Sequence, residues 1–219
     1  MPRRPREILL VVLFAALLPC AHAQAIVTFN FNDQSSPTAT LTASTVASHL
    51  TVGTFSVSDN AFTSTNLTTG SPPDSPAVGD TGSWNASSPT KYFSFTVTPD
   101  AGYSLTITGI SFDYRQTATG AANYQINIGA NTNVASGSFS TDSAWHSVSS
   151  SLTLTALTNG TEVRIYGYNG GVGSFGIDRV TLNGSVTAVP EPATYATIAA
   201  LCAFGFAAFR PKRKSASIA

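Results

Sequence analysis

Three side chains at alternating positions in residues 162–168 have the chemistry of a sugar-binding surface. Val163 and Ile165 alternate there with Arg164, Tyr166 and Tyr168. Because successive side chains of a strand point to opposite faces, we expect Arg164, Tyr166 and Tyr168 to share the face away from the core. Aromatic rings stack on the apolar face of a sugar while a guanidinium donates to its hydroxyls. The pattern predicts a glycan-binding face; an ordinary solvent face, or burial under a loop, is the alternative.

A second candidate is a structural Ca²⁺ site. Asn32 and Asp33 follow the first predicted strand, and Asp178 lies where the apolar alternation of the last one slips. Ca²⁺ takes six to eight oxygen ligands, and the first and last strands of a jelly roll are often neighbours. The alternative is that Asp178 pairs with Arg179 or caps a turn. No other cofactor is expected.

Nothing in the spacing of residues 24–188 singles out a catalytic centre. A glycosidase needs two carboxylates a few ångströms apart, and no acidic pair is marked by its position. His49 and His146 are the only histidines of this segment, and it contains no cysteine. Residues 171–176 match G-x-G-x-x-G, but a strand follows where a nucleotide site needs a helix, so we interpret them as a hairpin loop. We expect no enzyme activity, with a polysaccharide hydrolase as a minor alternative.

Short apolar runs rich in Val, Ile, Phe, Tyr and Thr, broken by Gly, Asn, Asp and Ser, are typical of strands. They predict an all-β, jelly-roll-like β-sandwich. Without a cysteine to form a disulfide, this domain must be stabilised by its core. The predicted strands are residues 26–31, 50–57, 92–98, 104–115, 124–128, 134–139, 145–148, 152–155, 162–168 and 174–186.

Two of these strands change the parity of their apolar positions. The change falls at Gly109 in one and at Asp178-Arg179 in the other, which predicts a β-bulge at each place. Residues 58–90 are rich in Ser, Thr, Pro and Asn, too long for a hairpin loop, and predict a functional or poorly ordered loop. Trp84 within it and Trp145 are further candidates for sugar stacking, with burial in the core as the alternative.

The N-terminus has the order of a secretory signal peptide over residues 1–23. Arg3, Arg4 and Arg6 precede the apolar residues 8–18, and an A-x-A cleavage site follows. Eleven apolar residues are too few to span a bilayer, which takes about 20. Signal peptidase is expected to cut after Ala23 of the Ala21-His22-Ala23 site, leaving Gln24 as the new N-terminus; Ala23-Gln24-Ala25 is a second candidate site.

The C-terminus has a different order, over residues 189–214. Val189-Pro190-Glu191-Pro192 precedes residues 193–209, which contain no charge. Seventeen helical residues rise about 25 Å, the low end of a transmembrane helix. Prolines keep the preceding chain extended, and the positive-inside rule leaves the basic cluster in the cytoplasm and residues 24–188 outside it. The cluster consists of Arg210, Lys212, Arg213 and Lys214.

This tail resembles the PEP-CTERM sorting signal of Gram-negative bacteria, also called the ice-binding protein C-terminal domain, a label that implies no ice binding here. The resemblance rests on Val189-Pro190-Glu191-Pro192, the alanine-rich apolar segment and the basic end. It implies that an exosortase, a membrane-embedded cysteine protease, recognises Pro190, Glu191 and Pro192. The substrate is then released or transferred to the cell surface. Family members accompany exopolysaccharide and biofilm production. An ordinary single-pass anchor is the alternative.

The exported part also resembles the jelly-roll domains of bacterial surface proteins and carbohydrate-binding modules. Residues 164–168, RIYGY, and 175–182, FGIDRVTL, have the form of their last two strands. This resemblance agrees with the jelly-roll-like sandwich that the strand pattern predicts.

The formal net charge of zero is the sum of unlike segments. Residues 25–189 carry nine acidic and four basic side chains, a net of −5, and Glu191 adds −1, between an N-terminal end of +2 and a basic C-terminal cluster of +4. The 27 Ser and 29 Thr make the chain polar through hydroxyls. An acidic domain of this kind is not expected to bind nucleic acid. The sequence predicts an exported structural or interaction protein of the envelope, with a glycan-binding module as the alternative.

Overall fold

The computed structural model describes residues 24–31, 41–58, 78–81, 84–191, 196–197, 199–200 and 203–204. The predicted signal peptide, with Ala21 and Ala23, lies outside the described residues. So do Asn32, Asp33 and Pro192, and the basic cluster of residues 210–214. Gln24 is the first residue of strand β1.

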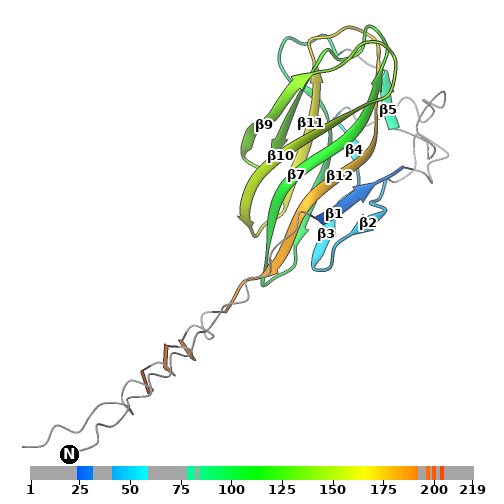
Figure 1. Ribbon diagram of the computed structural model, residues 1–219. Helices are drawn as coiled ribbons and strands as arrows, with labels where there is room; N and C mark the ends of the chain where they lie inside the picture. Colours follow the sequence, from blue (N-terminus) through cyan, green and yellow to red (C-terminus); the bar gives the residue numbers. More distant parts are fainter. Residues whose placement is uncertain are drawn as a thin grey trace, which may run out of the picture.

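The described chain forms two antiparallel sheets of six strands each, stacked face to face as a β-sandwich (Figure 1). This confirms the all-β sandwich predicted from the sequence. The first sheet has the order β10 (His146–Leu157), β7 (Tyr103–Gln116), β12 (Ser174–Ala188), β1 (Gln24–Phe29) and β2 (Thr45–Val46), with β5 (Val78–Thr81) paired to β12. The second has the order β3 (Leu50–Val52), β6 (Lys91–Pro99), β11 (Thr161–Tyr168), β8 (Asn123–Ile128) and β9 (Asn131–Ser138), with β4 (Ser56–Val57) paired to β6.

The core lies between the two sheets and is rich in aromatic side chains. Phe93 on β6 and Phe175 on β12 are fully buried, with ring centroids 5.4 Å apart across the gap between the sheets. Trp84 is 1% exposed and meets Phe175 edge to face at 5.1 Å. Burial removes a large apolar area from water for each ring, and such pairs add a further stabilisation. Trp84 is therefore a core residue, so burial, and not sugar stacking, is its role.

Both predicted bulges are present on neighbouring strands of the first sheet. The pairing of β7 with β12 skips Thr108 beside Gly109, and it shifts again between Asp178 and Thr181. Arg179 lies in that second shift with a φ of 45°, in the left-handed region that few residues other than glycine adopt. The parity changes in the sequence thus mark real changes of register.

Several predicted boundaries differ from the structure. Residues 146–148 and 152–155 belong to one strand, β10, because its pairing with β7 resumes after a register shift between Ser151 and Leu154. The glycine-rich residues 171–176 do not form a hairpin loop, because β11 and β12 lie in different sheets. Strands β2 and β5 were not predicted, since they are only two and four residues long, too short for an alternating pattern to be recognised.

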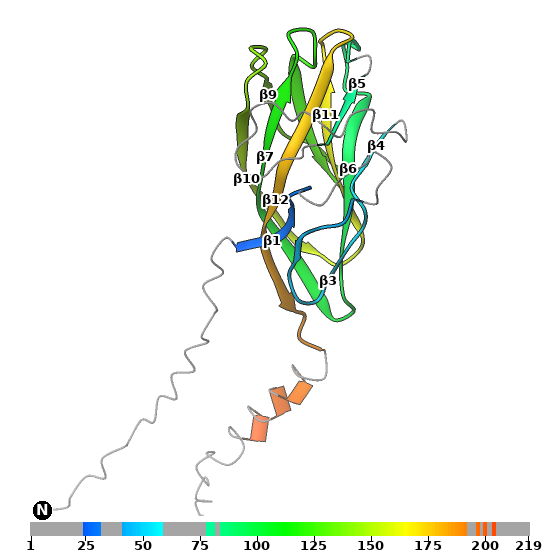
Figure 2. The same cartoon turned by 90° about the vertical axis from the view of Figure 1, so that its right-hand side faces the viewer.

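The connection from β11 to β12 crosses the top of the sandwich in Figure 2. Gly171 and Gly173 both donate their backbone N–H to the Thr119 carbonyl, at 3.0 and 2.9 Å. A Cβ on Gly170 would lie 1.8 Å from the Gly120 carbonyl oxygen. Glycine at position 170 is therefore required by the close approach of two loops.

Strand β12 leads directly into the predicted sorting motif. It ends at Ala188, and the Val189 N–H donates to the Gly102 carbonyl at 2.8 Å. Pro190 and Glu191 are exposed. Residues 196–197, 199–200 and 203–204 are helical. Within the described residues, no helix combines the length and the apolar composition required to span a membrane.

Candidate glycan-binding face

The outer surface of the second sheet carries the three side chains singled out on β11. Val163 and Ile165 are fully buried, whereas Arg164 and Tyr168 are partly exposed. The alternation predicted for this strand is therefore confirmed. Side chains two residues apart on one face of a strand are about 6.6–6.8 Å apart. We call the outer surface formed by β6, β11 and β8 the β11 face.

Arg164 is held by polar and aromatic neighbours from two strands. Its Nη2 lies 2.5 Å from Glu162 Oε2, and its guanidinium carbon lies 4.9 Å from the centroid of the Tyr92 ring. Its Nη1 lies 3.5 Å from the Tyr166 hydroxyl. The hydrogen bond that Arg164 donates to Glu162 raises the pKa of Arg164, so the guanidinium is charged at every accessible pH. Arg164 and Glu162 remain 40% and 35% exposed, so both can meet a ligand.

Tyr166 supports the face more than it presents a free ring. It is 7% exposed, and its ring lies 4.9 Å from that of Tyr92, the residue paired with it on β6. Tyr92 and Tyr168 are both partly exposed. The rings accessible to a sugar are therefore those of Tyr92 and Tyr168. Nothing in the sequence indicated that Tyr92 belongs to this face, because Tyr166, its partner on β11, lies 74 positions away.

Strand β8 adds a row of amides to the β11 face. Asn123, Gln125 and Asn127 pair with Tyr168, Tyr166 and Arg164 respectively. Gln125 Nε2 donates to Asn127 Oδ1 at 2.9 Å, which orients the two amides. Amides both donate and accept hydrogen bonds, as sugar hydroxyls require. The face therefore combines two accessible rings, one charge-compensated guanidinium and a row of amides.

Of the three residues predicted to bind Ca²⁺, the structure describes only Asp178. Strands β1 and β12 are neighbours, as the Ca²⁺ prediction requires. Asp178 is 2% exposed, and its Oδ1 accepts the backbone N–H of Arg179 at 2.7 Å. The Arg179 guanidinium pairs with Asp113. Among the residues that the structure describes, no three metal-binding side chains gather. Because Asn32 and Asp33 lie outside them, the Ca²⁺ site stays a prediction.

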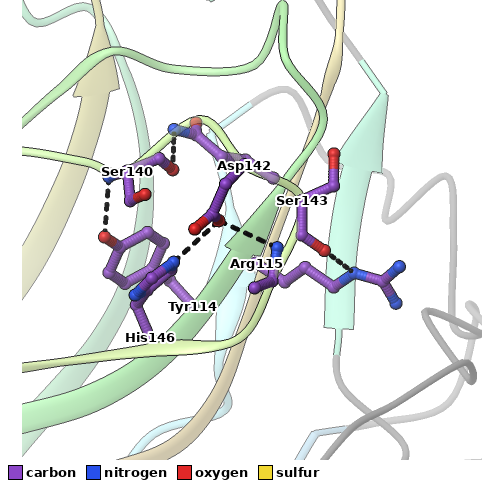
Figure 3. Close-up of polar contacts among 8 residues, drawn as sticks. Tyr114, Arg115, Ser140, Asp142, Ser143 and His146 are labelled. Carbon is purple, nitrogen blue, oxygen red and sulfur yellow. Dashed lines mark hydrogen bonds and ion pairs between the residues drawn. The ribbon is translucent and has the colours of Figure 1, made fainter.

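Asp142, in the loop between β9 and β10, contacts His146, the first residue of β10 (Figure 3). His146 Nε2 lies 2.7 Å from Asp142 Oδ1, and the His146 ring stacks on Tyr114 at 5.5 Å. The hydrogen bond from His146 lowers the pKa of Asp142 below its ordinary 3.8. A nucleophilic triad also needs a hydroxyl on the histidine, and within the described residues no serine donates to His146. The pair orders the loop. Its Asp-x-x-x-His spacing was visible in the sequence.

The two remaining sequence candidates lie near the ends of the sandwich. His49 stacks on Tyr103 at 3.9 Å, and its Nδ1 lies 3.5 Å from Asp100 Oδ2. Trp145 is partly exposed, and its indole N–H is buried without a hydrogen-bond partner in the described part of the chain. Neither residue belongs to the β11 face.

The sequence matches no protein family model and no curated protein. Solved structures with a related arrangement of strands include carbohydrate-binding modules and an adhesin. The module CBM36, in complex with calcium and xylotriose, is 20% identical, with 51% of this chain and 83% of that chain covered and a TM-score of 0.35. The family 11 module of Clostridium thermocellum, in complex with a mixed-linked tetrasaccharide, is 16% identical, with 77% and 100% covered and a TM-score of 0.33. The K3 cleaved adhesin domain of Lys-gingipain from Porphyromonas gingivalis W83 is 12% identical, with 73% and 98% covered and a TM-score of 0.38. Similarities of this size assign neither a family nor a ligand to the chain.

Proposed function

We propose that this chain is an exported envelope protein whose β11 face binds a neutral polysaccharide. The observation that carries the proposal is the cluster of Arg164, Glu162, Tyr92 and Tyr166, continuous with the accessible ring of Tyr168. Rings supply apolar area for a sugar, and the charged and amide groups supply hydrogen bonds that fix its orientation. The crossing of the chain between the sheets at β6–β7 and β11–β12 supports the jelly-roll interpretation.

The charges of the β11 face favour a neutral ligand. Glu162 compensates Arg164, so the pair has no net charge to attract an anionic polymer. Residues 25–189 carry a net charge of −5, and such a field repels polyanions. We therefore expect neutral polysaccharides to bind more tightly than uronic-acid polymers.

We infer the cellular location of the domain from the N-terminal and C-terminal segments of the chain. We propose export by the signal peptide, anchoring by residues 193–209 and processing by an exosortase at the PEP-CTERM motif. Support comes from Pro190 and Glu191, which are exposed directly after the last strand and so are accessible to a protease. The domain would then face the cell surface or the extracellular matrix, where polysaccharide is available. We assign no catalytic residue.

Affinity electrophoresis of the full chain in detergent tests the β11 face. Xylan, mannan and dextran serve as neutral polymers and alginate as the acidic one. At least one neutral polymer should retard the chain, and Tyr168→Ala should weaken that retardation about tenfold, which is about 1.4 kcal/mol. Tyr103→Ala is the matched control, since Tyr103 is a partly exposed tyrosine of the other sheet. Equal binding by the wild type and Tyr168→Ala would contradict the proposal.

Sorting is tested separately in a host that contains an exosortase. Replacing Pro190 and Pro192 with Ala should leave the chain unprocessed and reduce its surface display. Unchanged processing and display would refute the exosortase part, whereas polysaccharide binding by the purified chain is unaffected by either result.

A further inference from the structure

The outer surface of the first sheet, on the opposite side of the sandwich from the β11 face, carries a hollow that the proposed function does not use. Its volume is about 280 Å³. Strands β10, β7 and β12 form its floor and walls. We call it the Arg179 hollow; its lining consists of Ser111, Phe112, Asp113, Ser147, Val148, Ser149, Arg179 and Thr181.

A bulge turns a charged side chain toward this hollow. Arg179 has a φ of 45°, and its backbone N–H is held by Asp178 Oδ1 at 2.7 Å. A residue other than glycine is held in this strained region only when its surroundings require it, and such residues cluster at functional sites. Bulges re-aim side chains next to such sites. Here the guanidinium reaches β7 and pairs with Asp113 through both Nε and Nη2.

Asp113 is fixed from two sides at the edge of the hollow. Its side chain is 10% exposed, and its Oδ1 accepts the Ser147 hydroxyl at 2.5 Å. Each carboxylate oxygen has two lone-pair sites, so Oδ1 can accept a second hydrogen bond. The Arg179 side chain is 43% exposed, and its Nη1 is not used in the pairing with Asp113. The pair therefore offers an acceptor and a donor side by side.

Small hydroxyl residues form the floor next to this pair. Ser111 on β7 is paired with Ser149 on β10 and with Thr181 on β12. Neighbouring strands are about 4.7–4.9 Å apart, so three hydroxyls lie in a row across the sheet. Each hydroxyl can donate and accept. None of these side chains is long enough to fill the space above the floor.

We propose that the Arg179 hollow is a second saccharide site, for a neutral sugar that presents two adjacent hydroxyls. One sugar hydroxyl donates to Asp113 while its neighbour accepts from Arg179, and the remaining hydroxyls meet Ser111, Ser149 and Thr181. Asp113 compensates the positive charge of Arg179, so the pair has no net charge to attract an anionic sugar. The one aromatic residue of the lining, Phe112, is 1% exposed, so no ring is accessible for stacking and the site binds single residues of a chain weakly.

A second site on the opposite sheet changes what the domain can do. Two faces of one sandwich point in opposite directions, so two polysaccharide chains can be held at once. Multivalent contact of this kind raises the overall strength of attachment without a tighter single site. The domain would then cross-link the polymer as well as bind to it.

The test is saturation-transfer NMR of the full chain in detergent, with methyl β-D-glucopyranoside and methyl α-D-mannopyranoside as neutral probes and glucuronate as the anionic one. Ser149→Leu fills the hollow while leaving Asp113 and Arg179 in place. Ser151→Leu is the matched control, because Ser151 is an exposed serine of the same strand that lies outside the lining. All variants carry Tyr168→Ala, so that the β11 face contributes little.

We expect a signal from a neutral probe that Ser151→Leu retains and Ser149→Leu reduces at least fivefold. An equal signal from Ser149→Leu would overturn the proposal, as would the absence of signal from both neutral probes in the Tyr168→Ala background. A stronger signal from glucuronate than from the neutral probes would overturn the neutral assignment. If Tyr168→Ala alone changes nothing and Ser149→Leu abolishes the signal, the hollow binds sugar and the β11 face fails.

Discussion

Replacing Arg164 with Met separates its structural role from its role in binding. Met keeps an apolar stem of similar length and removes the charge, the hydrogen bond to Glu162 and the contact with the Tyr92 ring. The free energy of unfolding and the affinity for polysaccharide should both fall, but by different amounts. A loss of binding free energy that exceeds the loss of unfolding free energy indicates that Arg164 contacts the ligand directly.

The stability loss can be worked out from the contacts. Arg164 and Glu162 are 40% and 35% exposed, so solvent screens the ion pair, and it contributes at most about 1 kcal/mol. The contact with Tyr92 contributes about 0.5–1 kcal/mol at an exposed position. A total near 1 kcal/mol lowers the Tm of a domain of this size by about 2–4 °C. Differential scanning calorimetry of the full chain measures it.

The affinity loss should be larger. A hydrogen bond from a charged group is worth about 1.5–3 kcal/mol when its partner is left unpaired. That corresponds to a roughly 10- to 100-fold rise in Kd, measured by isothermal titration with the polysaccharide that binds best. The double variant Glu162→Gln with Arg164→Met removes the unpaired carboxylate. It should recover stability without recovering affinity.

One pattern of results would refute this assignment of Arg164. If Arg164→Met lowers the Tm but leaves the Kd within twofold of the wild type, the guanidinium only orders Tyr92 and Tyr166. Arg164→Lys provides a further check, because it keeps the charge and loses the planar fork of donors. Affinity in this variant should remain well below that of the wild type.

Two further predictions concern the scaffold. Gly167→Ala would place a Cβ 2.8 Å from both Ala121 Cβ and Trp84 Cε3, so urea denaturation should show that the free energy of unfolding falls by about 1–3 kcal/mol. Gly53→Ala is the control: its Cβ would have only ordinary contacts at 3.5 Å or more, so stability should be nearly unchanged. Equal effects of the two variants would contradict the packing argument. His146 lowers the pKa of Asp142, so this carboxylate should titrate below pH 3.8 in NMR. Its contribution to the order of the loop should be present above pH 3.8 and lost as the pH falls through the folded-state pKa. His146→Gln should move the titration midpoint of Asp142 back toward 3.8, and an unmoved midpoint would exclude His146 as the cause.

Local patterns of the chain predicted much of the fold. The alternation at Val163, Arg164 and Ile165 follows directly from the two-residue period of a strand. The parity change at Gly109 marked a bulge because an extra residue reverses which face each later side chain takes. Both features could be predicted from residues that are close together in the sequence.

The partners of those residues could not be predicted in the same way. Tyr92 and Tyr166 are 74 positions apart, and Asp113 and Arg179 are 66 positions apart. Which strands become neighbours depends on the packing of the whole sandwich, and the period within one strand carries no information about it. For the same reason residues 171–176 were mistaken for a hairpin loop, since a glycine-rich turn fits a crossover between sheets equally well.

Local sequence patterns were enough to predict an all-β domain, an outer face shared by Arg164, Tyr166 and Tyr168, and bulges at Gly109 and at Asp178-Arg179. Each of these depends on the direction of successive side chains along one strand. The tertiary structure was needed to show that Tyr166 packs against Tyr92, and that the Arg179 guanidinium pairs with Asp113. Burial and charge pairing are set by neighbouring strands, and neighbours are chosen when the two sheets close over a common core.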